Sequence, residues 1–328
     1  VIGFLTGLVL IFGFVTQFSS LATFAGFISA GIAVGLQSIL LSVAAYFFIV
    51  GRYGVRVGDR ITVAGVTGEV IEVGAEVTRF AVGDRVAALV PVGGYAAKAV
   101  ASEHDCLALP DGMSLIEGGG YGLVYGTVSH ALMQCANLQP GETLLVLGAA
   151  GGVGLAAVQL GKLMGARVIA AASTADKLAL TRAHGADDTI NYREQSLKGE
   201  VKALTQGEGA NVIFDPVGGP LAIECLSAAA WGARYLVVGF AEGNIPALPA
   251  NRLLLKELSA KGVAWGAFVA REPEVNAANF AQLARWYGEG KFKPVISGQY
   301  PLAEAPRALH DMLARKVTGK IVLVPDAA

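Results

Sequence analysis

A glycine-rich turn at residues 148–154, reading GAAGGVG, restricts the fold of this chain more than any other feature. An apolar run at 143–147 precedes it, and apolar residues recur at helical intervals over 155–164 after it. In the order strand, turn, helix, glycines allow the backbone to approach a pyrophosphate and to present N–H groups at the positive end of the helix. The sequence therefore predicts a dinucleotide site whose turn contains Gly151, Gly152 and Gly154.

The alternation of apolar runs continues beyond the turn. We expect further strands at 167–171, 188–191, 211–214 and 234–238, separated by helices at 175–184, 197–204 and 220–229. Strands that alternate with helices favour parallel pairing, because each helix carries the chain back across the sheet. The predicted fold class is therefore α/β, with a doubly wound parallel (Rossmann) sheet.

The end of the second predicted strand bears on which dinucleotide is bound. An acidic side chain there would accept a hydrogen bond from the ribose 2′-hydroxyl of NAD, whereas hydroxyl and basic groups suit the 2′-phosphate of NADP. Ser173 and Lys177 can reach such a phosphate, with Tyr192 nearby. Asp176 argues for NAD, but we expect it in the first turn of the next helix, capped by Ser173 or Thr174. NADP is favoured, and NAD stays open.

Charge is distributed unevenly, because residues 1–51 contain no Asp, Glu, Lys or Arg. As a helix this segment would extend about 75 Å, whereas one crossing of a bilayer needs about 20 residues. A polar cluster at 17–20 predicts a turn between two membrane-type helices, and Arg52, Arg56 and Arg60 mark the cytoplasmic side. We therefore expect a membrane anchor through residues 1–50 with the remainder in the cytoplasm. A secretory signal is the alternative, but its basic leader is lacking here.

A second pattern begins within this segment and continues after it, reading AGIAVGLQS at 30–38, GRYGVRVGDRI at 51–61 and GVTGEV at 65–70. It resembles the small-conductance mechanosensitive channel family, in which a Gly/Ala-rich pore helix leads into a small β-domain. The resemblance covers about residues 1–74 and implies a channel fragment as one alternative. An alternating apolar strand at 68–74 suits both the channel-like sequence before it and the sequence that follows it. We therefore place the junction of an apparent fusion there.

Further motifs accompany the glycine turn, reading VTRF at 77–80, VGDRV at 82–86, GGYA at 93–96, DPVGG at 215–219, VGF at 238–240 and TGK at 318–320. Together they make residues 75–325 resemble the zinc-free quinone oxidoreductase branch of the medium-chain dehydrogenases/reductases. The resemblance implies NADPH-dependent hydride transfer to a quinone or electron-poor alkene (an enone) and a homodimer.

The predicted organisation combines both resemblances. We expect a transmembrane hairpin at 1–50, a channel-type β segment at 51–74, part of a GroES-like β-barrel at 75–120, the NADP-binding Rossmann domain at 121–268, and a C-terminal helix and strands at 269–328.

The reductase resemblance also implies roles for individual residues. Gly152 and Val153 would hold the pyrophosphate, Phe240 would lie by the nicotinamide with Thr127 on the same side, and Arg315 would close over the cofactor. The full set of implied cofactor contacts is Thr127, Ala150, Gly151, Gly152, Val153, Ser173, Lys177, Tyr192, Val217, Gly239, Phe240 and Arg315.

Neither a metal site nor a protein acid or base is predicted. Catalytic zinc needs a Cys/His/Glu set and structural zinc four clustered cysteines, whereas the three cysteines here form no CxxC pair and neither Cys nor Asp stands near Leu123. Hydride transfer needs correct placement more than a catalytic side chain, so we name no catalytic residue. A net charge of −1 gives no basis for nucleic-acid binding.

The chain departs from the reductase family in one respect. The family's N-terminal barrel segment carries an Asn and Tyr cluster that lines the nicotinamide cleft, and channel-like sequence takes its place here. We therefore expect cofactor binding with turnover that is impaired. A non-functional fusion that only binds NADP is a further alternative.

Overall fold

The computed structural model describes residues 66–90 and 93–325. The predicted membrane-type helices in 1–50 and the channel-type segment up to residue 65 lie outside the described residues. In the part of the chain that is described, no helix is both long enough and apolar enough to cross a bilayer.

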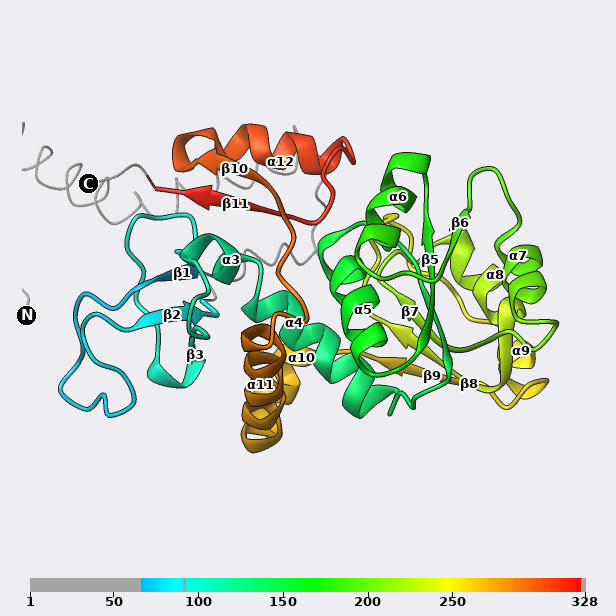
Figure 1. The fold of residues 1–328 in the computed structure, drawn as a ribbon, viewed down its shortest axis with the longest axis horizontal. Helices are drawn as coiled ribbons and strands as arrows, with labels where there is room; N and C mark the ends of the chain where they lie inside the picture. The colour runs from blue at the N-terminus through cyan, green and yellow to red at the C-terminus, as the bar shows by residue number, and fades with distance from the viewer. Residues whose placement is uncertain (1–65, 91–92, 326–328) are drawn as a thin grey trace, which may run out of the picture. The chain divides into compact units, whose positions relative to one another are not determined.

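A six-stranded sheet of parallel strands forms the centre of the larger region (Figure 1). Its order is β6-β5-β4-β7-β8-β9. This is the strand order of a doubly wound dinucleotide-binding fold, which confirms the predicted sheet. The strands are β4 (Thr143–Val146), β5 (Arg167–Ala172), β6 (Asp188–Asn191), β7 (Ala210–Asp215), β8 (Ala229–Val237) and β9 (Ser259–Gly262).

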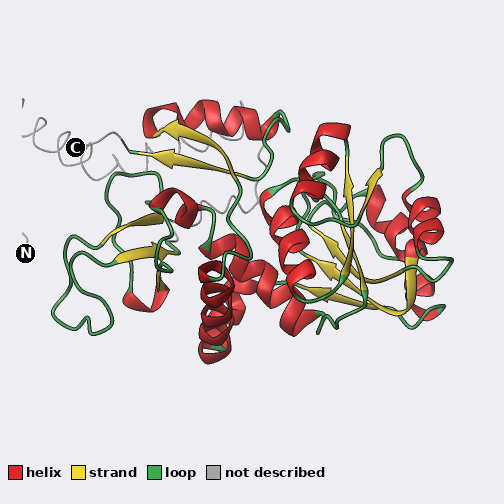
Figure 2. Ribbon diagram, in the orientation of Figure 1, coloured by secondary structure: helices red, strands yellow, loops and turns green. Residues whose placement is uncertain are grey.

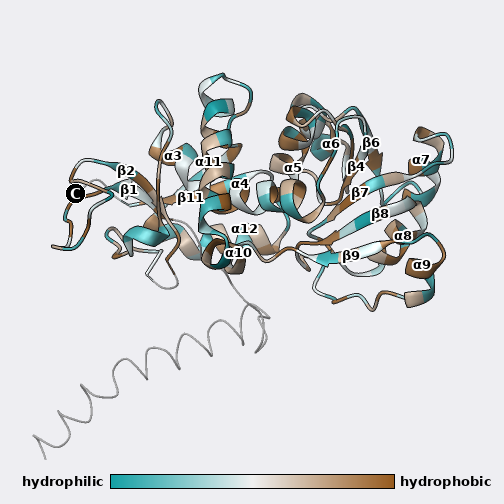
Figure 3. Ribbon diagram, turned by 90° about the horizontal axis from the view of Figure 1, so that it is seen from below, coloured by the Kyte–Doolittle hydropathy of each residue, from teal (hydrophilic) through white to brown (hydrophobic). Residues whose placement is uncertain are grey.

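Helices cover both faces of this sheet (Figure 2). Side chains alternate across each strand, so Leu144 and Val146 join one core cluster whereas Leu145 joins the other. The first cluster includes α4 (Gly122–Ser129) and α5 (Gly152–Leu163), and the second includes α7 (Leu197–Leu204) and α8 (Pro220–Ala228). Two further helices, α6 (Ala175–Ala183) and α9 (Ala250–Leu254), complete the layers. Apolar colour marks α9 in Figure 3, where Leu254 is exposed.

Before the parallel sheet, the chain forms a small antiparallel sheet of β1 (Val66–Glu69), β2 (Arg85–Ala88) and β3 (Cys106–Ala108). The strand predicted over 68–74 ends earlier, at Glu69. Val70 still exchanges backbone hydrogen bonds with Asp84 and Gly83, but Ile71 is 62% exposed. Apolar alternation alone was therefore misleading here, because a strand also needs a neighbour along its whole length.

The remaining elements connect and follow these sheets. They are η1 (Glu103–Asp105), α3 (Leu115–Gly119), the π-helical turn η2 (His130–Cys135), α10 (Trp265–Arg271), α11 (Pro273–Gly288), β10 (Ile296–Pro301), η3 (Leu302–Glu304), α12 (Ala305–Leu313) and β11 (Lys320–Val324). Strands β10 and β11 pair in parallel. A Cβ on Gly119, the last residue of α3, would lie 2.9 Å from Val322, so β11 packs closely against this helix.

Candidate active site

The glycine turn joins β4 to α5 at the carboxyl edge of the parallel sheet. Gly154 is required for this geometry, because a Cβ there would lie 2.3 Å from the carbonyl oxygen of Gly148. Gly151 N–H donates to that same oxygen, and Leu155 N–H donates to Gly151 O. Among the described residues, no side chain caps α5. The N–H groups of Gly152 and Val153, which precede the first intrahelical bond, therefore point toward the edge of the sheet.

The second group of predicted residues lies at the adjoining ends of β5 and β6. Thr174 accepts the cap hydrogen bond from Lys177 N–H, and Asp176 is exposed in the first turn of α6, which confirms the predicted arrangement. Tyr192 N–H donates to Ala172 O at 3.3 Å, which places Tyr192 beside the end of β5. Ser173 stands between them and is partly exposed.

Arg315 joins this group although it follows Lys177 by 138 positions. The Lys177 ammonium donates to the backbone oxygen of Arg315 at 3.1 Å. Arg315 ends the turn after α12 in a left-handed conformation, with φ of 55°, and its side chain is exposed. Lys177 therefore contacts Arg315 after the end of β5, and Tyr192 lies beside the same strand end.

The third group lies at the carboxyl ends of β7 and β8. Glu242 N–H donates to Val217 O, and Gly239 N–H donates to Asp215 O, so the loops after the two strands are tied together. The Phe240 ring would contact a Cβ placed on Gly218, at 3.0 Å, and is 40% exposed. Val217 in turn would lie 2.9 Å from a Cβ on Gly148, which connects this group to the glycine turn.

Thr127 is the predicted residue whose placement the structure supports least. It lies on α4, which packs along α5, and its hydroxyl donates to Leu123 O at 2.7 Å within its own helix. That bond occupies the hydroxyl proton, so a cofactor contact from Thr127 would use its acceptor lone pair or its methyl group.

A buried pair behind the third group was not predicted from the sequence. Tyr235 O–H donates to the Asp215 carboxylate, whose second oxygen accepts N–H bonds from Val217 at 2.7 Å and Gly218 at 2.8 Å. Burial, followed by the charge of Asp215, raises the pKa of Tyr235 far above its ordinary value. The DPVGG motif pointed to the loop, but no pattern in the sequence joins it to a tyrosine in the next strand.

Histidine and cysteine side chains lie apart from these groups. His130 stacks on Phe268 and contacts the Cys135 sulfur at 3.4 Å within η2, and both residues are buried. Cys106 is partly exposed on β3, at the edge of the small sheet. Across residues 66–90 and 93–325, no three His, Cys, Asp or Glu side chains gather as metal ligands would.

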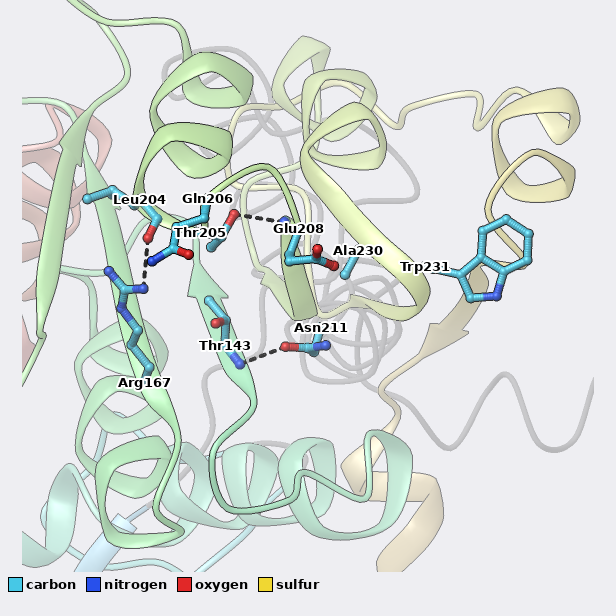
Figure 4. Close-up of a pocket in the computed structure, with 10 residues that line it drawn as sticks. Thr143, Arg167, Leu204, Thr205, Gln206, Glu208, Asn211, Ala230 and Trp231 are labelled. Carbon is cyan, nitrogen blue, oxygen red and sulfur yellow. Dashed lines mark hydrogen bonds between the residues drawn. The ribbon is translucent and has the colours of Figure 1, made fainter.

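A polar cavity of about 350 Å³ lies at the opposite edge of the parallel sheet, at the amino ends of its strands (Figure 4). Its lining includes Thr143, Arg167, Asn211 and Trp231. Thr143 N–H donates to Asn211 Oδ1, and Arg167 donates to the backbone oxygen of Leu204. These polar groups already form hydrogen bonds with the strands and loops around the cavity. The glycine turn lies at the far end of β4. The cavity is therefore separate from the candidate site.

The fold and the glycine turn together define a dinucleotide-binding domain of the Rossmann class. Comparison with known proteins narrows this class. Residues 152–283 match the family described as zinc-binding dehydrogenase, and residues 38–99 match the mechanosensitive ion channel β-domain. The channel-like match runs past the predicted junction at 68–74 and includes β2.

Individual known proteins are similar to this chain over its reductase portion. A quinone oxidoreductase-like protein 2 homolog of Nematostella vectensis is 40% identical over 261 residues, covering 79% of this chain and 71% of the relative. A solved quinone oxidoreductase of Pseudomonas syringae has a TM-score of 0.75 at 32% identity, covering 80% of this chain and 81% of its own. The Escherichia coli quinone oxidoreductase complexed with NADPH has a TM-score of 0.76 at 26% identity, covering 85% and 86%. The chain belongs to the quinone oxidoreductase-like family of medium-chain dehydrogenases/reductases.

Proposed function

We propose that this chain binds NADPH at the carboxyl edge of its parallel sheet and transfers hydride to a quinone or an electron-poor alkene without a metal. One observation carries the proposal: the glycine turn, Lys177, Tyr192 and Arg315 come from four separate segments and all lie at the carboxyl edge of the sheet, where Lys177 contacts Arg315. Ligands of doubly wound sheets bind at this edge.

The first turn of α5 fits a diphosphate. Gly152 and Val153 supply N–H groups without intrahelical acceptors, and the helix dipole adds partial positive charge at the same end. A Cβ on Gly152 would lie 3.3 Å from the Gly319 carbonyl oxygen. A diphosphate can therefore approach the turn closely only while position 152 has no side chain. Ala150 and Gly151 complete the wall of the turn.

The preference for NADPH over NADH follows from the group at the ends of β5 and β6. Lys177 is a cation, and Ser173 and Tyr192 carry hydroxyls, all suited to a 2′-phosphate. Asp176, the acidic residue in this stretch, is exposed on the first turn of α6. There its carboxylate interacts favourably with the helix N-terminus, and it does not end β5.

The loops after β7 and β8 provide the reacting end of the site. NADPH, when bound, supplies the hydride. Val217, Gly239 and Phe240 would orient the nicotinamide and exclude water from it, and Phe240 offers a flat apolar surface to an acceptor ring. Placement contributes much of such catalysis, so the proposal assigns no acid or base. The metal-free part rests on the lack of a Cys/His/Glu set in the sequence.

The test is to follow NADPH oxidation by the full chain with benzoquinone as acceptor, with NADH as the comparison and with a chelator in a parallel reaction. We expect faster oxidation of NADPH than of NADH and no effect of the chelator. NADPH binding without turnover would instead favour a fusion that only binds the cofactor. Absence of NADPH binding would overturn the proposal.

We further propose that residues 1–50 anchor the chain to a membrane with the reductase portion in the cytoplasm, and that this portion forms a homodimer. The uncharged N-terminal sequence and the match to a channel β-domain support the anchor. Carbonate extraction of membranes from expressing cells tests it, because an inserted chain stays in the pellet. Recovery of the chain in the supernatant would contradict the membrane anchor. The homodimer is tested separately by light scattering, which gives the mass of the protein after correction for bound detergent.

A further inference from the structure

The Lys320 side chain lies against the first turn of α5. The preceding residue, Gly319, donates its N–H to Ala150 O at 2.7 Å and forms a bridge with Gly151, which holds the start of β11 beside the glycine turn. A Cβ on Gly120 would lie 3.5 Å from Cβ and Cγ of Lys320, and a Cβ on Gly152 would lie 3.8 Å from its Cδ. The aliphatic stem therefore runs from the start of α4 to the first residue of α5.

This lysine differs from others in its electrostatic surroundings. Lys162, Lys291 and Lys316 each lie within 4.0 Å of a carboxylate, whereas among the residues that the structure describes no such partner is found for Lys320. Its side chain is partly buried, and burial lowers its pKa from the ordinary value. Partly buried charges are normally paired, so an anion is expected beside the Lys320 ammonium.

We propose that Lys320 binds the diphosphate bridge of the dinucleotide and supplies the cation that accompanies the N–H groups of Gly152 and Val153. The ammonium is two bonds beyond Cδ, so it stays within reach of the end of α5 where those groups converge. The inference rests on the proposed NADPH site and adds a second lysine to it. Lys177 would serve the 2′-phosphate and Lys320 the diphosphate, so that each anionic group of the cofactor meets its own cation.

The experiment compares NADPH binding by the full chain and by Lys320→Met, using the change in NADPH fluorescence. Adenosine 2′-monophosphate, which lacks the diphosphate, is measured by its competition with NADPH. A charge-assisted hydrogen bond predicts that Lys320→Met weakens NADPH binding about 10- to 100-fold. Binding of adenosine 2′-monophosphate should not change, and that result also shows that the variant is folded. Lys320→Arg, which keeps the charge, should recover most of the affinity.

Lys291→Met is the matched control, because it removes a lysine that pairs with Glu289 on the surface. It should bind NADPH like the original chain. Equal NADPH affinity in Lys320→Met and the original chain would overturn the inference, as would a loss confined to the acceptor KM, since the counter-charge would then be the acceptor. Failure of the original chain to bind NADPH would refute the proposed function itself.

Discussion

Gly154 is a position where an added methyl group would meet backbone atoms that cannot move aside. Its Cβ would lie 2.3 Å from Gly148 O and 2.7 Å from Ala149 Cα. We expect Gly154→Ala to lower the free energy of unfolding by about 1–3 kcal/mol, as overpacking does, and to weaken NADPH binding. Urea unfolding measures the first effect. Gly266→Ala is the control, since its Cβ would meet nothing within 4 Å. An unchanged unfolding midpoint for Gly154→Ala would show that the turn tolerates the methyl group.

The buried pair of Tyr235 and Asp215 holds the loop that carries Val217. Tyr235→Phe leaves one carboxylate oxygen without its donor, so we expect a loss of about 1–3 kcal/mol of stability at neutral pH. Tyr300→Phe is the control, because its bond to Asp311 lies nearer to solvent. A loss no larger than that of the control would contradict a stabilising role for the buried bond.

The same pair predicts a pH dependence. Burial and Asp215 raise the pKa of Tyr235 in the folded chain, whereas an unfolded tyrosine ionises near pH 10. A raised folded pKa gives stability that is complete below the unfolded pKa and is lost as the pH rises above it. The stability difference between the original chain and Tyr235→Phe should therefore stay constant up to about pH 10 and then shrink. A difference that grows above pH 10 would contradict this assignment.

At the level of elements, Arg234 joins the start of β4 to β8 and η2. It pairs with Glu142 and donates to Ala136 O, while its Nε has no partner among the described residues. We expect Glu142→Gln to cost about 1–3 kcal/mol, because the partly buried guanidinium loses its counter-charge. Glu304→Gln removes an exposed pair with Arg307, which solvent screens, and should cost much less. Equal unfolding midpoints for the two variants would refute the difference.

The parallel sheet was largely predictable because the strand and helix patterns in the sequence agree with the contacts that the folded sheet makes. The predicted bounds of β6 and α7 match the structure, and Thr174, one of the two residues predicted as the cap, caps α6. Predicted strand boundaries were wrong where pairing with a neighbouring strand sets them. Strand β8 begins five residues before the predicted 234, because Ala229 pairs with Ala210. The π-helical turn at 130–135 had no sequence signal, and in the structure its first residue, His130, stacks on Phe268 from a distant helix.

For the whole molecule, the sequence predicted which segments form the site but not how distant ones meet. Lys320 belongs to the TGK motif at 318–320, but its place beside Gly152 depends on the β-bridge between Gly319 and Gly151. The approach of Arg315 to Lys177 likewise depends on the fold of the C-terminal segment. Such contacts are set by long-range packing, which spacing along one chain does not encode.

The bridge between Gly319 and the glycine turn couples two parts of the chain that the cofactor would bind together. A ligand present at 100 times its Kd stabilises the folded state by about 2.7 kcal/mol. If the diphosphate meets both Gly152 and Lys320, NADPH should slow hydrogen exchange at 148–154 and at 318–320 to a similar degree. Helix α7 lies on the other core cluster and should change less, which provides an internal control. Protection of 148–154 alone would mean that the C-terminal segment does not contact the cofactor, and that the bridge only supports the turn.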